Sequence, residues 1–359
     1  MERISREPLL ACDLEADSLH HYQERVCLIQ LSVPRESVLI DPLAFGDLSP
    51  LGTVLADPAI LKIFHGADYD IRSLHRDFGI EVVNLFDTMI ACQFLGEKEV
   101  GLAAVLKRRF GVDLDKRYQK ADWSKRPLSP EMIDYAIKDT CMLSELYLEL
   151  ETELREIGRL GWVEEECELL SRVRTVVRGE EAFFIRFKGA SGMEPRTLAV
   201  LEELLCFRDE KARARDVPAF KILGNETLRE LAVKKPRKGS ELSGVPGLTP
   251  KLVDRYGEDI VSAVSRGMAI PAERLPRFPR FPRRIREKDQ EERLQRLKLW
   301  RESKAQEVGI DPGLLANNAL LDSLAGTSGQ TGDSGDFLPM KQWQNELFGR
   351  EILDLLRTG

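Results

Sequence analysis

The sequence predicts an α/β domain followed by two related all-α domains. Short apolar runs separated by turns fill residues 1–90, whereas the later apolar residues have mainly helical spacing. The C-terminal half also contains an internal repeat. The stretch FRDEKARARDVPAFKILGNETLRELA, which begins at Phe207, is similar to WRESKAQEVGIDPGLLANNALLDSLA, which begins at Trp300. A helical repeat of this length indicates two copies of one domain.

Four apolar runs predict the strands of the first domain. They are LLACDLEAD at 9–17, VCLIQLSV at 26–33, SVLIDP at 37–42 and LKIFHG at 61–66. Each run has the length and the apolar, β-branched content of a strand, and polar or proline-containing turns separate the first three. Strands at the start of the domain and helices afterwards indicate a mixed α/β layer structure.

Helices are predicted after the fourth strand. The segment DYDIRSLHRDFG has helical spacing and ends at Gly79, a residue type that commonly closes helices. From Asp87 onward the pattern is mainly helical, and we expect Asp87 itself to cap a helix. Ser129 and Pro130 form a typical helix start, and the apolar periodicity carries that helix to about Arg155.

These patterns divide the chain into four parts. We expect the α/β domain with its connecting helix at 1–170, helical domains at 192–268 and 289–359, and a linker at 269–288. The linker segment RLPRFPRFPRRIREK is predicted to be extended, because repeated proline fixes φ and removes donors. The glycine-rich GTSGQTGDSG is predicted to be an irregular loop.

Composition narrows the cellular setting. None of the six cysteines forms a CxxC pair, which favours reduced, buried thiols over disulfides or a zinc site. No apolar run reaches the roughly 18 residues that a membrane span needs, and the N-terminal residues lack the apolar core of a secretory signal. We therefore expect a cytoplasmic protein without a membrane partner. Because the net charge is −7, a nucleic-acid-binding surface would need basic residues that are clustered locally.

Acidic residues in three separate segments predict a metal site. Asp13 and Glu15 lie two apart in a strand, so their side chains leave the same face. Asp70 opens a helix directly after a strand, and Tyr135 and Asp139 lie one helical turn apart. Two carboxylates about 4 Å apart repel by about 4 kcal/mol at an effective dielectric constant of about 20. Divalent cations, which prefer hard oxygen ligands, would offset that repulsion.

The order of these motifs is similar to that in the DEDD exonucleases, in the tyrosine-containing branch that includes the ribonuclease D family. The matching motifs are DLE at 13–15 with VCLIQLS, FHG followed by Asp70, and Tyr135-x-x-x-Asp139, together with LDKRYQKADWSKRPL at 114–128. The resemblance covers about residues 8–150. The repeats resemble HRDC domains, the helicase-and-ribonuclease-D C-terminal module. Together, these resemblances imply a ribonuclease H-like α/β exonuclease domain with a mixed sheet, followed by two HRDC-type domains.

The resemblance also implies a reaction. Asp13, Glu15, Asp70 and Asp139 would hold two divalent cations, Mg²⁺ or Mn²⁺, one activating water and the other stabilising the leaving 3′ oxygen. Tyr135 would orient that water. The implied activity is a 3′–5′ exoribonuclease that releases nucleoside 5′-monophosphates from RNA with a single-stranded 3′ end, with tRNA precursors as one substrate class. We expect a monomer.

Several residues are candidates for RNA contact. Basic side chains interleaved with aromatic ones suit a single strand, through phosphate charge and base stacking. The candidates are His21, Tyr22, His65, Lys116, Arg117, Lys120 and Trp123. For His65, a buried, hydrogen-bonded position at a strand end is favoured over substrate contact. His21 and Tyr22 either stack on a base or form an exposed hairpin, and the sequence leaves both open.

Two other functions compete with the exoribonuclease. The same acids serve DNA 3′–5′ exonucleases, and no residue visibly reads a 2′-hydroxyl. A non-catalytic RNA-binding scaffold is the second alternative, although all four acids and the tyrosine are present. The second helical copy has fewer basic residues, which favours a packing role for it.

Overall fold

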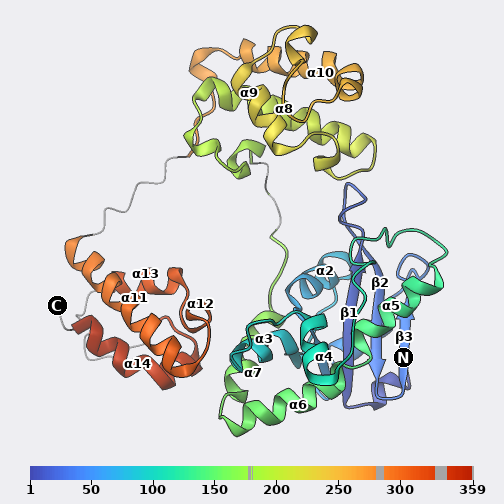
Figure 1. Ribbon diagram of the computed structural model, residues 1–359, viewed down its shortest axis with the longest axis vertical. Helices are drawn as coiled ribbons and strands as arrows, with labels where there is room; N and C mark the ends of the chain where they lie inside the picture. The colour runs from blue at the N-terminus through green and yellow to red at the C-terminus, as the bar shows by residue number, and fades with distance from the viewer. Residues whose placement is uncertain (177–178, 180, 280–286, 328–337, 358–359) are drawn as a thin grey trace. The chain divides into compact units, whose positions relative to one another are not determined.

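The computed structural model describes residues 1–176, 179, 181–279, 287–327 and 338–357 (Figure 1). Its contacts divide the chain into two compact units. The first contains Met1–Ala16, Val26–Thr175 and Arg284–Gly359, and the second contains Asp17–Arg25 and Val176–Arg283. The second helical repeat therefore belongs to the unit of the α/β domain, and the first repeat forms its own unit with a short N-terminal segment.

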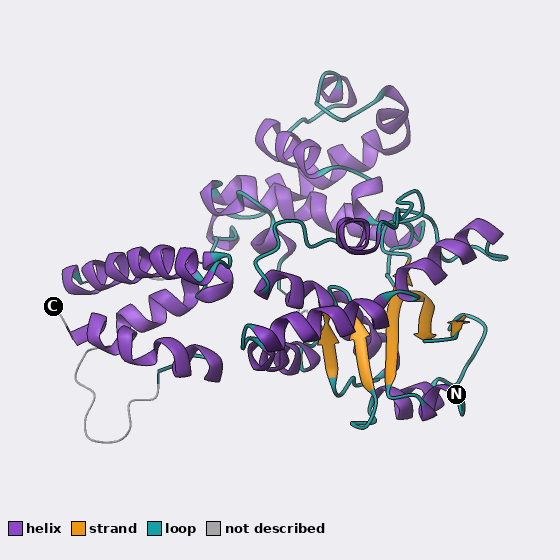
Figure 2. Cartoon of the chain, turned by 60° about the horizontal axis from the view of Figure 1, so that its bottom comes forward, coloured by secondary structure: helices purple, strands orange, loops and turns teal. Residues whose placement is uncertain are grey.

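A mixed five-stranded sheet is the centre of the first unit (Figure 2). The strands are β1 (Leu9–Ala16), β2 (Val26–Val33), β3 (Glu36–Ile40), β4 (Leu61–Phe64) and β5 (Leu85–Asp87), in the order β3-β2-β1-β4-β5. β1 pairs antiparallel with β2 and parallel with β4, whereas β3 is antiparallel to β2 and β5 is parallel to β4. The mixed sheet and its first four strands confirm the sequence prediction. β5 was not predicted, because its three residues are too few to show a period.

Helices surround the sheet. They are α1 (Ser49–Leu55), α2 (Asp68–Phe78), α3 (Thr88–Phe94), α4 (Leu102–Phe110), α5 (Pro130–Thr140), α6 (Leu143–Glu156) and α7 (Leu160–Ser171). Two predicted helix boundaries are confirmed, the stop of α2 at Gly79 and the start of α3 at Asp87. Gly79 closes α2 in the left-handed region at φ 66°, and the Asp87 carboxylate caps α3 by accepting from the backbone N–H groups of Met89 and Ile90. α5 packs across β1, β2 and β3.

The prediction of a single helix from Pro130 to about Arg155 is wrong. The chain turns at Cys141 and Met142, so that α5 and α6 are separate helices. The turn contains neither glycine nor proline, and the apolar periodicity continues through it, which is why the pattern does not reveal it. At the end of α5, the Thr140 hydroxyl lies 2.7 Å from the Ser32 hydroxyl of β2 and ties the helix to the sheet.

The second helical repeat consists of α11 (Lys288–Val308), α12 (Pro312–Leu315), α13 (Asn318–Gly326) and α14 (Gln342–Arg357). Its Trp343 is stacked on Trp162 of α7 with ring centroids 5.1 Å apart, and it meets Phe94 of α3 edge-on at 5.4 Å. Lys341 also pairs with Glu166 at 2.5 Å. The repeat therefore shares an apolar core with the α/β domain. The glycine-rich loop predicted after α13 lies mostly outside the described residues.

The second unit is built on α8 (Pro195–Ala214), α9 (Asn225–Lys234) and α10 (Pro250–Ala269). α8 and α10 cross closely at Gly267, where an added Cβ would lie 2.6 Å from the Val200 Cα. The described residues also contain short 3-10 helices. One lies in the first unit, at Ile4–Arg6, and the others lie in the second unit, at Phe183–Arg186, Ala190–Gly192, Ala219–Lys221, Gly239–Leu242 and Ala272–Arg274. Part of the predicted extended linker, 280–286, lies outside the described residues.

Candidate active site

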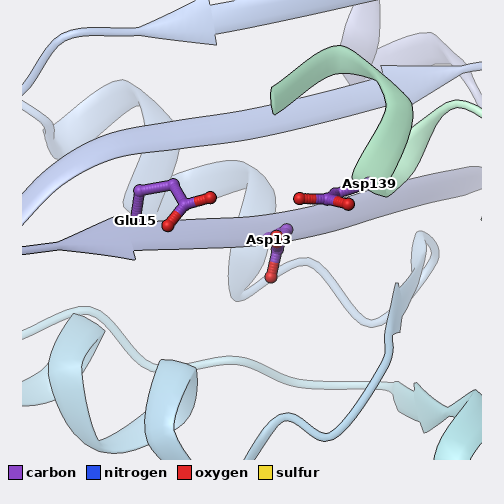
Figure 3. A group of neighbouring side chains, drawn as sticks. All are labelled: Asp13, Glu15 and Asp139. Carbon is purple, nitrogen blue, oxygen red and sulfur yellow. The ribbon is translucent and has the colours of Figure 1, made fainter. Parts of the chain in front are cut away.

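Three carboxylates from two elements meet beside the centre of the sheet (Figure 3). Asp13 and Glu15 project from β1, and Asp139 projects from α5. Their ligand oxygens lie within 4.8 Å of one another. Carboxylate oxygens at this spacing are a ligand set that a hard divalent cation prefers.

Local structure explains why these side chains converge. The period of two in a strand sends Asp13 and Glu15 to one face of β1. Asp139 lies near the C-terminal end of α5. The helix begins at Pro130, directly after Ser129, whose hydroxyl accepts a hydrogen bond from the Met132 N–H at 3.3 Å. This cap and the Thr140 contact with β2 fix both ends of the helix that carries Asp139.

The carboxylates line a cavity of about 320 Å³. Besides the three acids, it is lined by His65, Tyr135, Lys116, Gln119 and the first residues of α4, Leu102 to Ala104. The Tyr135 side chain is largely buried, and its ring lies 5.8 Å from that of Tyr118. The cavity lining therefore combines the three acids with a lysine and an amide.

Burial and mutual repulsion disfavour negative charge in this group. Burial raises the pKa of Asp13 well above its usual range, with further increases from the charges of Asp70 and Glu15. The pKa of Glu15 rises from 4.5 to about 9, through burial and then the charge of Asp139. Burial also raises the pKa of Asp139 to about 6, although a hydrogen bond from Tyr135 opposes this shift. A cation in the cavity would relieve the repulsion.

Asp70 lies near the other acids without joining their tight group. It occupies the first turn of α2, is 6% exposed, and has a pKa raised to about 8 by burial. Its negative charge raises the pKa of both Asp13 and Glu15. It is not one of the three residues whose oxygens lie within 4.8 Å.

The chain matches known proteins along its whole length. A model of the 3′–5′ exonuclease family matches residues 1–155, and the HRDC domain model matches 197–264 and 290–356. Ribonuclease D of Jannaschia sp. is 32% identical over 99% of this chain and 91% of the relative. The chain belongs to the ribonuclease D family. The two domain types occur in the order expected from the sequence.

Solved structures agree with this ribonuclease D assignment. The crystal structure of Escherichia coli RNase D, described as an exoribonuclease involved in structured RNA processing, has a TM-score of 0.71 and 27% identity. It covers 99% of this chain and 95% of that one. The catalytic core of RRP6 from Trypanosoma brucei has a TM-score of 0.65 and 30% identity, covering 74% of this chain and 76% of that one. This ribonuclease D-family chain is thus a 3′–5′ exoribonuclease.

Residues of segment 114–128 lie in different environments. Lys116 is exposed and lines the cavity, whereas Arg117 is exposed and pairs with Asp115 at 2.6 Å. Lys120 is also exposed. Trp123 is only 1% exposed and packs 6.0 Å from the Tyr135 ring. This burial corrects the expectation that Trp123 stacks on a base, because its indole packs against the Tyr135 ring instead.

The three other RNA-contact candidates have protein partners. His65 directly follows β4 and lines the cavity, and its Nδ1 is 2.9 Å from the Thr88 hydroxyl. His21 and Tyr22 belong to the second unit, where the His21 ring contacts Asp216 at 2.6 Å and the Tyr22 hydroxyl donates to Asp209 at 2.7 Å. Neither residue forms a freely exposed hairpin.

Sequence reasoning missed part of the cavity wall. Gln119 and the start of α4, from Gly101 to Ala104, were not singled out. Gln119 lies inside segment 114–128, which resembles the exonuclease family, and this position could have indicated that Gln119 lies near the site. The start of α4 offered only small and apolar residues, which carry no chemical signature. No helix among the described residues is long and apolar enough to cross a membrane.

Proposed function

We propose that this chain removes nucleoside 5′-monophosphates from the 3′ end of RNA with two divalent cations, Mg²⁺ or Mn²⁺. The observation that carries the proposal is the convergence of Asp13, Glu15 and Asp139 within 4.8 Å in an open cavity. Asp70, which interacts with this group, would be the fourth ligand. Bound cations would supply Lewis-acid stabilisation of the negative charge that develops on the phosphate.

Tyr135 is proposed to position the attacking water. Its hydroxyl interacts with Asp139 one turn further along α5, and the pair lines the cavity. Because burial and the nearby carboxylates raise the pKa of Tyr135, its phenol remains protonated at neutral pH and is a hydrogen-bond donor. A donor held by the packed rings of Trp123 and Tyr118 would restrict the water to one orientation.

The proposed substrate is RNA with a single-stranded 3′ end, including tRNA precursors. Exposed Lys116 at the cavity rim would contact a backbone phosphate, and Lys120 lies in the same exposed segment. The E. coli relative is described as acting in structured RNA processing, which supports a folded RNA whose 3′ tail enters the cavity. A direct comparison of RNA and DNA of one sequence tests whether DNA is a substrate as well.

The test uses 5′-labelled RNA and DNA of one sequence, with and without a 3′-phosphate, in Mg²⁺ or Mn²⁺. We expect a ladder from the free 3′ end of RNA. Asp139→Ala should abolish the ladder while RNA binding persists, and Asp134→Ala, an exposed acid on the same helix, should retain it. Metal-dependent cleavage by purified Asp139→Ala would contradict the mechanism. An equal DNA ladder would contradict the proposed substrate.

A further inference from the structure

A buried glutamine beside the carboxylates has no partner for either polar atom within the described part of the chain. Gln30 of β2 is 0% exposed, and neither its Nε2 nor its Oε1 has a hydrogen-bond partner among the described residues. A buried amide without partners costs folding free energy, so such groups in proteins are rare and call for an explanation. The sequence placed Gln30 only within an apolar strand.

The register of the sheet places Gln30 next to a proposed metal ligand. Gln30 pairs with Asp13 across the antiparallel β1–β2 ladder, and on its other side with Leu39 of β3. Directly paired residues send their side chains to the same face, with Cβ atoms about 4.5–5.5 Å apart. Leu39 has no polar side-chain atom. Asp13 is therefore the neighbour in this row that can form a hydrogen bond with the amide.

α5 covers this row. Tyr135 and Ala136 pack with Leu28 of β2, and Thr140 forms its hydrogen bond with Ser32 of the same strand. Leu28 and Ser32 pair with Glu15 and Ala11, so both lie on the face of Gln30 and on either side of it. Gln30 consequently lies beneath the helix that carries Asp139. Because this position is buried, a hydrogen-bond partner for the Gln30 amide has to come from the protein and not from bulk water.

We propose that Gln30 is a positioning residue whose amide nitrogen donates to the Asp13 carboxylate and holds it in the orientation that binds metal. An ionised carboxylate only accepts hydrogen bonds, and the glutamine amide offers two donors, so the pair is complementary. The hydrogen bond forms when the ligand is held by its cation. This inference rests on the proposed metal site and extends it to a residue behind the ligands.

The test measures metal affinity directly. Metal-free wild type, Gln30→Met and Gln30→Leu are titrated with Mn²⁺ by calorimetry, and their thermal unfolding is followed in EDTA. Loss of an outer-shell partner typically weakens metal binding by about 10–100-fold. We expect weakening of that size in both variants, with metal-free stability unchanged or increased because an unsatisfied amide has been removed. At limiting Mn²⁺ kcat should fall while KM for RNA is unchanged, and excess Mn²⁺ should recover part of the rate.

Gln344→Leu is the matched control. Gln344 is also a buried glutamine, but it lies in α14, away from the carboxylates, and its amide donates to the Leu315 carbonyl oxygen at 2.7 Å. Its replacement should lower thermal stability and leave Mn²⁺ affinity unchanged. Mn²⁺ affinity of both Gln30 variants within about twofold of wild type would overturn this inference alone. A wild-type protein that binds no Mn²⁺ would overturn the proposed metal site as well.

Discussion

Tyr135 shows how one residue couples the rate to pH. Tyr135→Phe removes a positioned donor, so we expect kcat to fall by about 10²–10³-fold. The same change removes the hydrogen bond that lowers the pKa of Asp139 from a value otherwise raised by burial. The acidic limb of the pH–rate profile should therefore move to higher pH. Rates of 3′-end removal across pH check this, with Tyr118→Phe as the control ring. A near-normal rate would show that the water is oriented otherwise.

Glu15 sets a pH dependence of stability in the metal-free protein. Its pKa is about 9 in the folded chain against an ordinary 4.5, so the folded state binds the proton more tightly. Stability from such a group is present below the unfolded value and is lost as pH rises through the folded value. In EDTA we expect Tm to fall between about pH 5 and pH 9.

Glu15→Gln removes this titrating group, and its Tm should fall less over the same range. Glu2→Gln, which changes an exposed carboxylate, should follow the wild type. Thermal unfolding at several pH values in EDTA, repeated with Mn²⁺, measures the effect. Metal should restore wild-type stability at high pH. Parallel curves for wild type and Glu15→Gln would contradict the role of this carboxylate.

At the scale of elements, α5 depends on its cap. Ser129→Ala leaves an N–H at the helix start without its acceptor, and such losses cost about 1 kcal/mol. We expect that decrease in the free energy of urea unfolding. Ser129→Asp keeps an acceptor oxygen and adds a favourable charge at the helix start, so it should retain the stability. Equal losses in the two variants would show that another interaction holds the helix start.

Elements were predictable where a local pattern was long enough. The strand run LLACDLEAD and the Ser129-Pro130 helix start identified β1 and the beginning of α5, which together carry the three converging acids. The break after Thr140 was not predictable, because a contact with Ser32 far away in the sequence accompanies it and no breaker residue marks it. The β1–β2 register, which pairs Gln30 with Asp13, is likewise a tertiary property. For Trp123, residue type suggested stacking, but only the fold showed its burial.

At the scale of the whole molecule, the two helical repeats have different environments. The repeats are similar in sequence, yet the second shares one apolar core with the α/β domain and the first forms a separate core with residues 17–25. The sequence indicated duplication but not this division, because core sharing depends on which side chains meet in space. The aromatic group of Trp343, Trp162 and Phe94 is the clearest reason for the division.

This grouping predicts that the second repeat stabilises the catalytic domain. Trp343 is 2% exposed, and replacing a buried tryptophan by alanine typically costs about 3–5 kcal/mol. We expect Trp343→Ala in the full chain to lower the free energy of urea unfolding by that amount. Loss of 3′-end removal should occur at the same lower urea concentration, since Trp162 and Phe94 lose their cover. Leu299→Ala, at a side chain 72% exposed in the same repeat, should change neither. Activity that survives to the wild-type urea concentration would show that the catalytic domain is stable without this contact.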